Sequence, residues 1–109
     1  MYNMGYVYLI CDPETNRFKI GVTRENIKER IKKLQTGNST ELFISSYYES
    51  RFPFRLEKML HNKFKEKKEL NEWFNLENKD IFNFKKICEQ QEELINLLLT
   101  NPFFSKGIR

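Results

Sequence analysis

Two short segments of strand-like sequence, followed at once by a basic amphipathic segment, limit the possible fold more than any other feature of the chain. Residues 6–10 are aromatic, β-branched or apolar, as β-strands prefer. Residues 12–16 contain the proline, aspartate and asparagine that are typical of turns. Residues 18–22 then alternate apolar with polar or small residues, which predicts a second strand with one apolar face. The sequence therefore predicts a β-hairpin that leads directly into a helix.

The remaining sequence predicts one more strand and two more helices. Thr23 or Asn26 is a suitable N-cap for the first helix, and Gly37 is a suitable stop. The other expected elements are a strand over 42–49, a helix over 54–67, an extended piece over 71–76 and a helix over 79–99 that ends before Pro102. We expect an α/β (α+β) fold, with a three-stranded, mainly antiparallel sheet flanked by helices. A chain of 109 residues is long enough for one such domain over residues 1–109.

Helical geometry places three polar side chains at the edge of the core. At about 100° per residue, Arg30 lies beside the apolar stripe of the first helix, which consists of Ile27, Ile31 and Leu34. In the helix over 54–67, Glu57 lies at the edge of the apolar stripe, and His61 lies beside it at the i+4 position. A carboxylate at the rim of a core needs a partner or a metal, because an unpaired buried charge is costly.

Several segments, taken in order, resemble the GIY-YIG nuclease superfamily. The matching pieces are Val7-Tyr8, Lys19-Ile20-Gly21, Arg30, the stretch from Leu34 to Asn38, and the series Glu57, Leu60-His61, Phe64 and Glu72-Trp73-Phe74. They are similar to a phage- and virus-associated branch, often labelled a DNA-binding domain, that has KIG in place of YIG. The resemblance covers about residues 5–76, with the helix over 79–99 added at the C-terminal side.

The resemblance implies catalytic roles for three of the matching residues. Glu57 would hold one divalent metal, Mg²⁺ or Mn²⁺, while Tyr8 helps to activate water and Arg30 steadies the charge on the phosphate. Waters and phosphate oxygens commonly complete the shell of magnesium held by one carboxylate. Lys19 replaces the second tyrosine of the family, and we infer that its charge favours the Tyr8 phenolate. The role of His61 stays open between metal ligand, proton carrier and support for the site.

One feature of the family has no assigned residue in this sequence. The family has a late asparagine that supports the site, and Asn71, Asn75 and Asn78 are all candidates for it. Gly21 is expected to let a backbone or a phosphate approach closely, because glycine has no side chain.

The distribution of charge favours a polyanionic partner, most simply DNA. The formal net charge is +4, and residues 17–36 alone contain seven Lys or Arg against two Glu. Four basic residues of this segment are the expected nucleic-acid contacts: Arg24, Lys28, Lys32 and Lys33. A domain this short contacts few base pairs, so we expect a monomer or a weak homodimer with little sequence specificity.

No feature of the sequence predicts a secreted or membrane protein. Cys11 and Cys88 do not make a disulfide framework or a zinc site, and we expect both to be buried thiols. No signal peptide and no stretch of membrane-spanning length is present. We expect a soluble, cytoplasmic protein, inside the host cell if a phage or virus encodes it.

Three functions fit the sequence to different degrees. The leading prediction is a metal-dependent endonuclease that hydrolyses DNA phosphodiester bonds. The alternative is a catalytically inactive nucleic-acid-binding module of the same fold, which the Lys19 replacement and the unplaced asparagine favour. A weaker alternative is an interaction protein that docks through the apolar run from Leu94 to Leu99, although this run also suits packing against the sheet.

Overall fold

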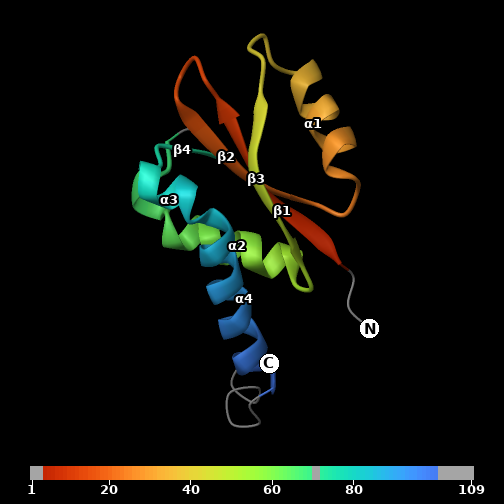
Figure 1. Cartoon of the computed structure of the whole chain (residues 1–109), viewed down its shortest axis with the longest axis vertical. Coiled ribbons are helices and arrows are strands. Elements are labelled where there is room, and N and C mark those ends of the chain that lie inside the picture. The colour runs from red at the N-terminus through yellow and green to blue at the C-terminus, as the bar shows by residue number, and fades with distance from the viewer. Residues whose placement is uncertain (1–3, 70–71, 101–109) are drawn as a thin grey trace.

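The computed structural model describes residues 4–69 and 72–100. It contains a four-stranded antiparallel sheet with the strand order β3-β1-β2-β4 (Figure 1). The elements are β1 (Gly5–Asp12), β2 (Arg17–Thr23), α1 (Ile27–Thr36), β3 (Phe43–Ser50), α2 (Pro53–Lys63), the 3-10 turn η1 (Lys65–Lys67), β4 (Trp73–Phe74), α3 (Asn78–Phe82) and α4 (Phe84–Thr100). The predicted α+β class is confirmed.

The sheet has one strand more than predicted. The extra strand, β4, consists of only Trp73 and Phe74, which pair with Lys19 and Phe18 at the edge of β2. Two residues are too few to show the alternation that identifies a strand in a sequence. The predicted extended piece over 71–76 contains β4, although its first residue, Asn71, lies outside the described residues.

The hairpin forms as its residue types predict. β1 and β2 pair in one continuous register from Tyr6 opposite Thr23 to Asp12 opposite Arg17. In the turn, the Asp12 side chain accepts a hydrogen bond from the backbone N–H of Glu14 at 3.1 Å. This Asx contact is the local bonding that makes aspartate common in turns.

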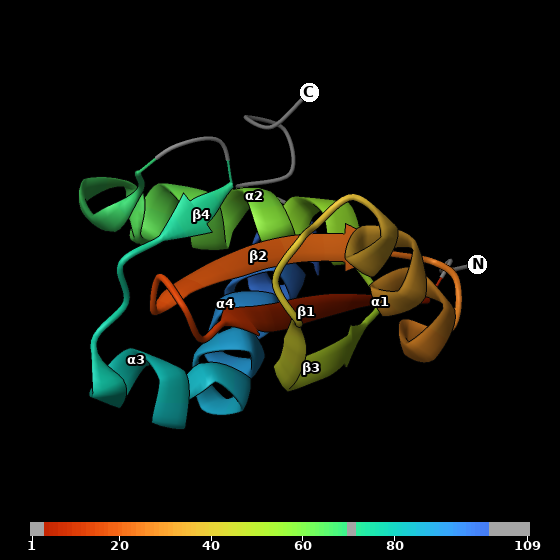
Figure 2. The same cartoon turned by 90° about the horizontal axis from the view of Figure 1, so that it is seen from above.

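Helices cover the two faces of the sheet unequally (Figures 1 and 2). Successive residues of a strand point to opposite faces, so the apolar residues of β1 and β2 divide between two cores. The larger core packs beneath α2 and α4 and consists of Val7, Leu9, Phe18, Ile20, Leu56, Leu60, Phe64, Phe74, Leu76, Phe84, Cys88 and Ile95. The smaller core packs beneath α1 around Tyr8, Ile10 and Leu42.

The start of α1 is capped by one of the two predicted residues. Asn26 is the N-cap, and its side-chain oxygen accepts a hydrogen bond from the N–H of Lys28 at 2.8 Å. Thr23 instead accepts a hydrogen bond from the N–H of Glu25 at 3.1 Å, within the approach to the helix. The helix ends at the predicted stop, Gly37. These caps fix the direction in which α1 leaves the hairpin.

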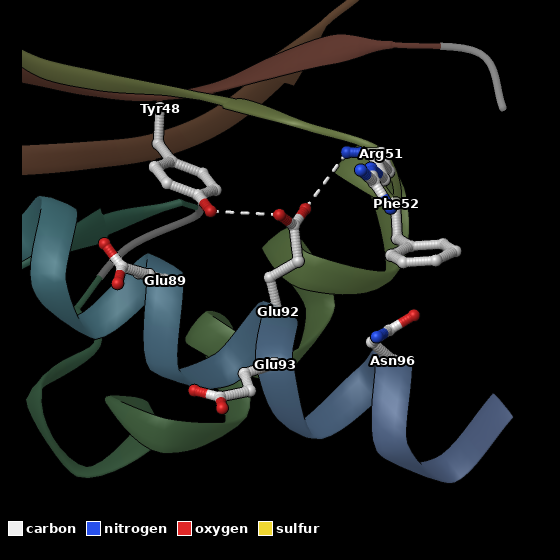
Figure 3. A pocket seen from close by; sticks show the side chains of 7 residues that line it. All are labelled: Tyr48, Arg51, Phe52, Glu89, Glu92, Glu93 and Asn96. Atoms are coloured by element: carbon white, nitrogen blue, oxygen red, sulfur yellow. Dashed lines mark hydrogen bonds between the residues drawn. The ribbon is translucent and has the colours of Figure 1, made fainter. Parts of the chain in front are cut away.

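A single carboxylate from α4 ties the end of β3 to the start of α2. Glu92 accepts hydrogen bonds from the Tyr48 hydroxyl at 2.9 Å, from the Arg51 backbone N–H at 3.0 Å, and from the Ser50 hydroxyl (Figure 3). The Ser50 hydroxyl also accepts a hydrogen bond from the N–H of Phe52 at 2.9 Å. Burial and the bond to Glu92 raise the pKa of Tyr48. This network holds α2 against the sheet.

Both predicted C-terminal helices are divided. The helix expected over 54–67 ends at Lys63 and is followed by η1, and the helix expected over 79–99 is split at Asn83 into α3 and α4. Asp80 belongs to the cap at the start of α3, where its carboxylate accepts a hydrogen bond from the Glu77 N–H at 3.0 Å and binds Lys67 of η1 at 2.6 Å. The expected stop at Pro102 lies outside the described residues.

The cysteines are only partly as expected. Both are free thiols, but Cys88 is buried while Cys11 is partly exposed, so the prediction of two buried thiols was wrong for Cys11. No helix in the described part of the chain is long and apolar enough to cross a membrane.

Candidate active site

The candidate site lies at the part of the β2 edge that β4 leaves uncovered. Because β4 pairs only with Phe18 and Lys19, the edge from Ile20 onward is open to side chains from α2. A ring nitrogen of His61, Nε2, lies 2.8 Å from the backbone carbonyl oxygen of Ile20. The His61 ring also packs edge-on against Phe74, with the ring centroids 5.0 Å apart. These two contacts hold the imidazole at the edge of the sheet.

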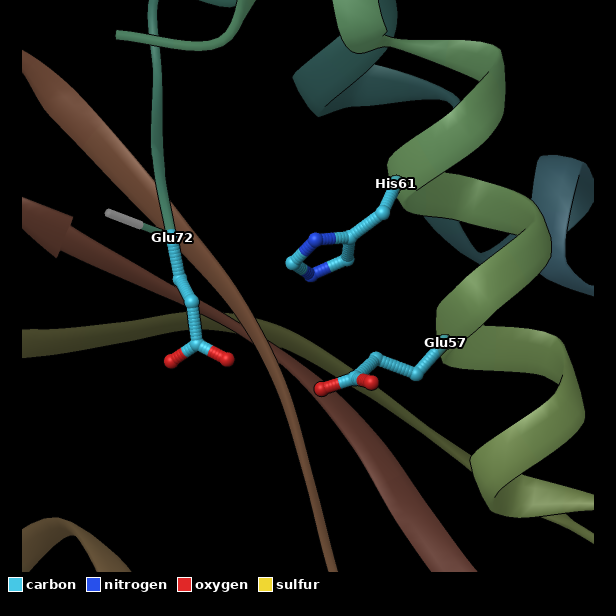
Figure 4. Close-up of side chains that lie close together, drawn as sticks. All are labelled: Glu57, His61 and Glu72. Carbon is cyan, nitrogen blue, oxygen red and sulfur yellow. The ribbon is translucent and has the colours of Figure 1, made fainter. Parts of the chain in front are cut away.

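Three side chains that can bind a metal meet at this edge (Figure 4). One donor atom each from Glu57, His61 and Glu72 lies within 4.8 Å of the other two, and all three residues are partly buried. Glu57 and His61 lie one turn apart on α2, whereas Glu72 immediately precedes β4. The sequence placed Glu57 beside His61 but did not assign a role to Glu72. Its position before Trp73 in the matched segment was the only signal available.

The two carboxylates have opposite electrostatic surroundings. Burial raises the pKa of Glu57, and the negative charge of Glu72 adds to that effect, while His61 and Lys19 partly oppose it. Burial also acts to raise the pKa of Glu72, but the hydrogen bond and charge of Lys19 outweigh it, so the pKa is lowered. Glu57 therefore carries its negative charge at a cost that a bound cation would relieve.

Lys19, whose charge we expected to favour the Tyr8 phenolate, forms an ion pair with a carboxylate of the site. Its amine forms an ion pair with Glu72 and lies 5.9 Å from the centroid of the Trp73 ring. In the described residues no hydrogen bond joins it to Tyr8. The structure thus brings Lys19 into the site as the partner of Glu72.

Gly21 provides the space in which the Tyr8 ring lies. The two residues are paired across β1 and β2, and a Cβ atom added to Gly21 would lie 2.3 Å from both Cζ and the hydroxyl oxygen of Tyr8. The predicted close approach of a backbone or phosphate at Gly21 is therefore wrong, because the phenol ring occupies that space. Tyr8 is 1% exposed.

The hydroxyl of Tyr8 meets the predicted arginine of α1. Nε of Arg30 donates to this hydroxyl at 3.3 Å. That hydrogen bond raises the pKa of Arg30, and the negative charge of Glu72 acts in the same direction. Among the described residues, no ion pair joins Arg30 to Glu57. The guanidinium thus connects Tyr8 with the acidic cluster.

The five predicted catalytic residues belong to one connected region of the structure. The contacts of Tyr8 with Arg30, of Lys19 with Glu72, and of Glu57 with His61 are linked by the electrostatic interactions of Glu72. Two of the candidate asparagines, Asn75 and Asn78, are exposed, and neither side chain bonds to the cluster within the described residues. The third candidate asparagine falls in the undescribed gap.

The four predicted nucleic-acid contacts are all exposed, on α1 or the segment before it. Two of them are already engaged, Lys32 with Glu29 at 3.8 Å and Lys33 with Glu25 at 2.8 Å. The other two are Lys28, in the first turn of α1, and Arg24, whose guanidinium lies over the ring of Phe54. Exposed ion pairs contribute little stability, so all four side chains remain available to a phosphate backbone.

The donor set at the β2 edge suits a divalent cation. A metal bound at about 2.1 Å keeps its ligand atoms roughly 3–4 Å apart, and the donor atoms of Glu57, His61 and Glu72 lie within 4.8 Å of one another. Two carboxylates suit Mg²⁺ or Mn²⁺, and an added imidazole favours Mn²⁺ over Mg²⁺. The bond from His61 to a backbone carbonyl is the usual way in which a metal-binding imidazole is oriented.

Together, the fold and this site form a small α+β domain in which a phenol, a guanidinium and a carboxylate cluster lie near one edge of the sheet. The family model described as the T5orf172 domain matches residues 5–95, and the chain belongs to that family. This family is a phage-associated, GIY-YIG-like nuclease-type domain. The match extends beyond the predicted core of residues 5–76 and includes most of α4. Comparisons with curated proteins and with solved structures gave no match.

Proposed function

We propose that this protein is a metal-dependent endonuclease that hydrolyses DNA phosphodiester bonds. The observation that carries the proposal is the meeting of Glu57, His61 and Glu72 next to the hydrogen-bonded pair of Tyr8 and Arg30. Phosphodiester hydrolysis needs an activated water and stabilisation of the charge on the phosphate. A proton acceptor would meet the first requirement, and positive charge would meet the second. Tyr8 and Arg30 are the residues proposed for these two roles.

The residues of the cluster would hold the metal and the phosphate in place. Glu57 and Glu72 supply carboxylate oxygens, with His61 as the third donor, and Mg²⁺ or Mn²⁺ fits this set. A divalent cation bound there would supply charge stabilisation to a phosphate oxygen. The ion pair of Lys19 with Glu72 keeps that carboxylate oriented toward the cluster.

Tyr8 is the proposed acceptor of the proton from the attacking water. Its hydroxyl must first release its own proton to solvent, and the positive guanidinium of Arg30, which donates a hydrogen bond to this oxygen, stabilises the resulting phenolate. The phenolate then takes the proton of the attacking water. Arg30 would thus act on Tyr8 in the electrostatic role that was predicted for Lys19. The same guanidinium is positioned to steady the charge on the phosphate.

The test is nicking of supercoiled plasmid by the purified protein with Mg²⁺, with Mn²⁺ and with EDTA. We expect nicking that depends on the metal, and a loss of at least about 100-fold in Glu57→Gln. Binding of Glu57→Gln to a labelled oligonucleotide should change little, because phosphate contacts made by other residues carry the affinity. Glu93→Gln, an exposed change on α4, is the matched control and should nick normally. Equal nicking in EDTA, or full activity of Glu57→Gln, would contradict the proposal.

A second candidate function is a nucleic-acid-binding module without catalytic chemistry. The observation that favours it is the ion pair of Lys19 with Glu72, which uses one carboxylate of the cluster for a side chain of the protein itself. This function predicts DNA binding that weakens steeply with salt and no product with either metal. The same plasmid assay separates it from the endonuclease.

A further inference from the structure

An exposed aromatic ring paired with a cation lies next to the candidate site. Phe54, in the first turn of α2, is 50% exposed, and the guanidinium of Arg24 lies over its ring at 4.7 Å from the centroid. Arg24 follows the last residue of β2 and is itself exposed. Within the described residues no carboxylate pairs with Arg24. Solvent therefore reaches both a ring and a planar cation at this place.

The geometry of α2 puts this ring on the same helix face as the acidic cluster. Phe54 and Glu57 are three residues apart, and His61 follows four residues later, so the three side chains fall within a sector of about 60°. Residues three apart on a helix have Cβ atoms about 5–6 Å apart. A phosphate bound at Glu57 would thus lie about one nucleotide from a base bound at Phe54.

The open edge of β2 runs alongside the same three side chains. His61 bonds to Ile20, and Arg24 lies over Phe54, so α2 runs antiparallel to the last part of β2. Seven residues of helix rise about 10.5 Å, and four residues of strand span about 13 Å. These similar lengths agree with a continuous surface from the ring to the imidazole.

We propose that Phe54 and Arg24 form a stacking subsite for an unpaired nucleobase next to the cleaved phosphate. Aromatic rings and arginine planes both stack on bases, and a nearby cation adds attraction to the adjoining phosphate. In an intact duplex the two faces of each base are covered by its neighbours, so only an unpaired or extruded base can reach the ring. The substrate class is therefore single-stranded DNA or DNA with a local distortion. The position of the phosphate in this inference rests on the proposed function.

Binding of a single-stranded oligonucleotide that contains 2-aminopurine tests the subsite, because stacking quenches the fluorescence of this base. The measurement is made in EDTA, so that no cleavage is needed. We expect Phe54→Ala to weaken binding about tenfold and to lose most of the quenching, while Phe54→Trp keeps both. Binding of the fully paired duplex should change less than about twofold, because it offers no free base face.

Two further variants make the result specific. Phe82 on α3 is 89% exposed, so Phe82→Ala removes a ring that is more accessible than Phe54 but lies on another helix, and it should leave binding and quenching unchanged. Arg24→Ala should lower the slope of log affinity against log salt by about one, whereas Phe54→Ala should leave that slope unchanged. These slopes separate a lost phosphate contact from a lost stacking contact.

Three outcomes would overturn the subsite: unchanged affinity and quenching in Phe54→Ala, equal weakening of single-stranded and duplex binding, or an equal loss in Phe82→Ala. Circular dichroism of each variant checks that the fold is kept, and Phe54→Trp must restore binding. A failure of plasmid nicking contradicts only the proposed function, since the stacking measurement requires no cleavage.

Discussion

Two glutamates, Glu57 on α2 and Glu92 on α4, belong to helices that pack on the same face of the sheet, yet their carboxylates have opposite surroundings (Figures 3 and 4). Both are partly buried. Glu92 accepts hydrogen bonds from two hydroxyls and one backbone N–H. Glu57 accepts no hydrogen bond from any residue of the described part, and burial raises its pKa.

The difference separates a carboxylate that holds the fold from one that is available to a ligand. The donors around Glu92 balance the cost of removing its charge from water, so the network stabilises the folded protein. Among the described residues Glu57 has no such hydrogen-bond donors, and the charges of His61 and Lys19 only partly offset the effect of its burial. Clustered ionisable groups whose burial is only partly offset are typical of functional sites.

The largest expected effect on stability is that of Glu92→Ala. This change leaves the donors of Tyr48, Ser50 and Arg51 without their common acceptor, and we expect a loss of about 2–4 kcal/mol in the free energy of unfolding. For a domain of this size the loss lowers the melting temperature by roughly 10 °C or more. Thermal unfolding measures it, with Glu93→Ala as the exposed control. A melting temperature equal to that of the control would show that the network does not hold the fold.

A smaller effect on stability, with a large effect on the site, is expected for Gly21→Ala. The added methyl group overlaps the buried Tyr8 ring, and relieving this contact should cost about 1–3 kcal/mol. Displacement of Tyr8 also breaks its bond with Arg30, so nicking should fall although Glu57 is unchanged. Gly37→Ala is the control, since its Cβ would have its nearest neighbour at 3.8 Å. Normal nicking by Gly21→Ala would remove Tyr8 from the mechanism.

The smallest effect on stability is expected for Glu57→Gln, which should stabilise the folded protein slightly. Because the folded-state pKa of Glu57 is raised, folding disfavours its charged form at neutral pH, and the neutral glutamine removes that penalty. Solvent screening limits the gain in stability to less than about 1 kcal/mol. The gain should disappear as the pH falls through the raised pKa, since the wild-type carboxyl then becomes neutral as well. Unfolding of both proteins over a pH series tests this, and a loss of stability at neutral pH would contradict it.

The elements with local signals were predictable from the sequence. Alternation in residues 18–22 identified β2, Asn26 and Gly37 marked the ends of α1, and the i+4 spacing placed His61 beside Glu57. Each of these signals depends on residues a few positions apart, whose relation is fixed by strand or helix geometry. The same reasoning missed β4, because two residues are too short to carry a period.

The partners of the polar side chains in the site were decided only by tertiary structure. Lys19 and Glu72 are 53 residues apart in the chain, and Arg30 and Tyr8 are 22 apart. No local pattern relates such residues, because their contact depends on how α1, α2 and β4 pack around β2. The sequence by itself therefore indicated the hairpin, the third strand and the helical segments, and it indicated the candidate residues other than Glu72. The tertiary packing decided that Glu72 joins the cluster, that Lys19 forms an ion pair with Glu72, and that the Tyr8 ring takes the space that Gly21 leaves.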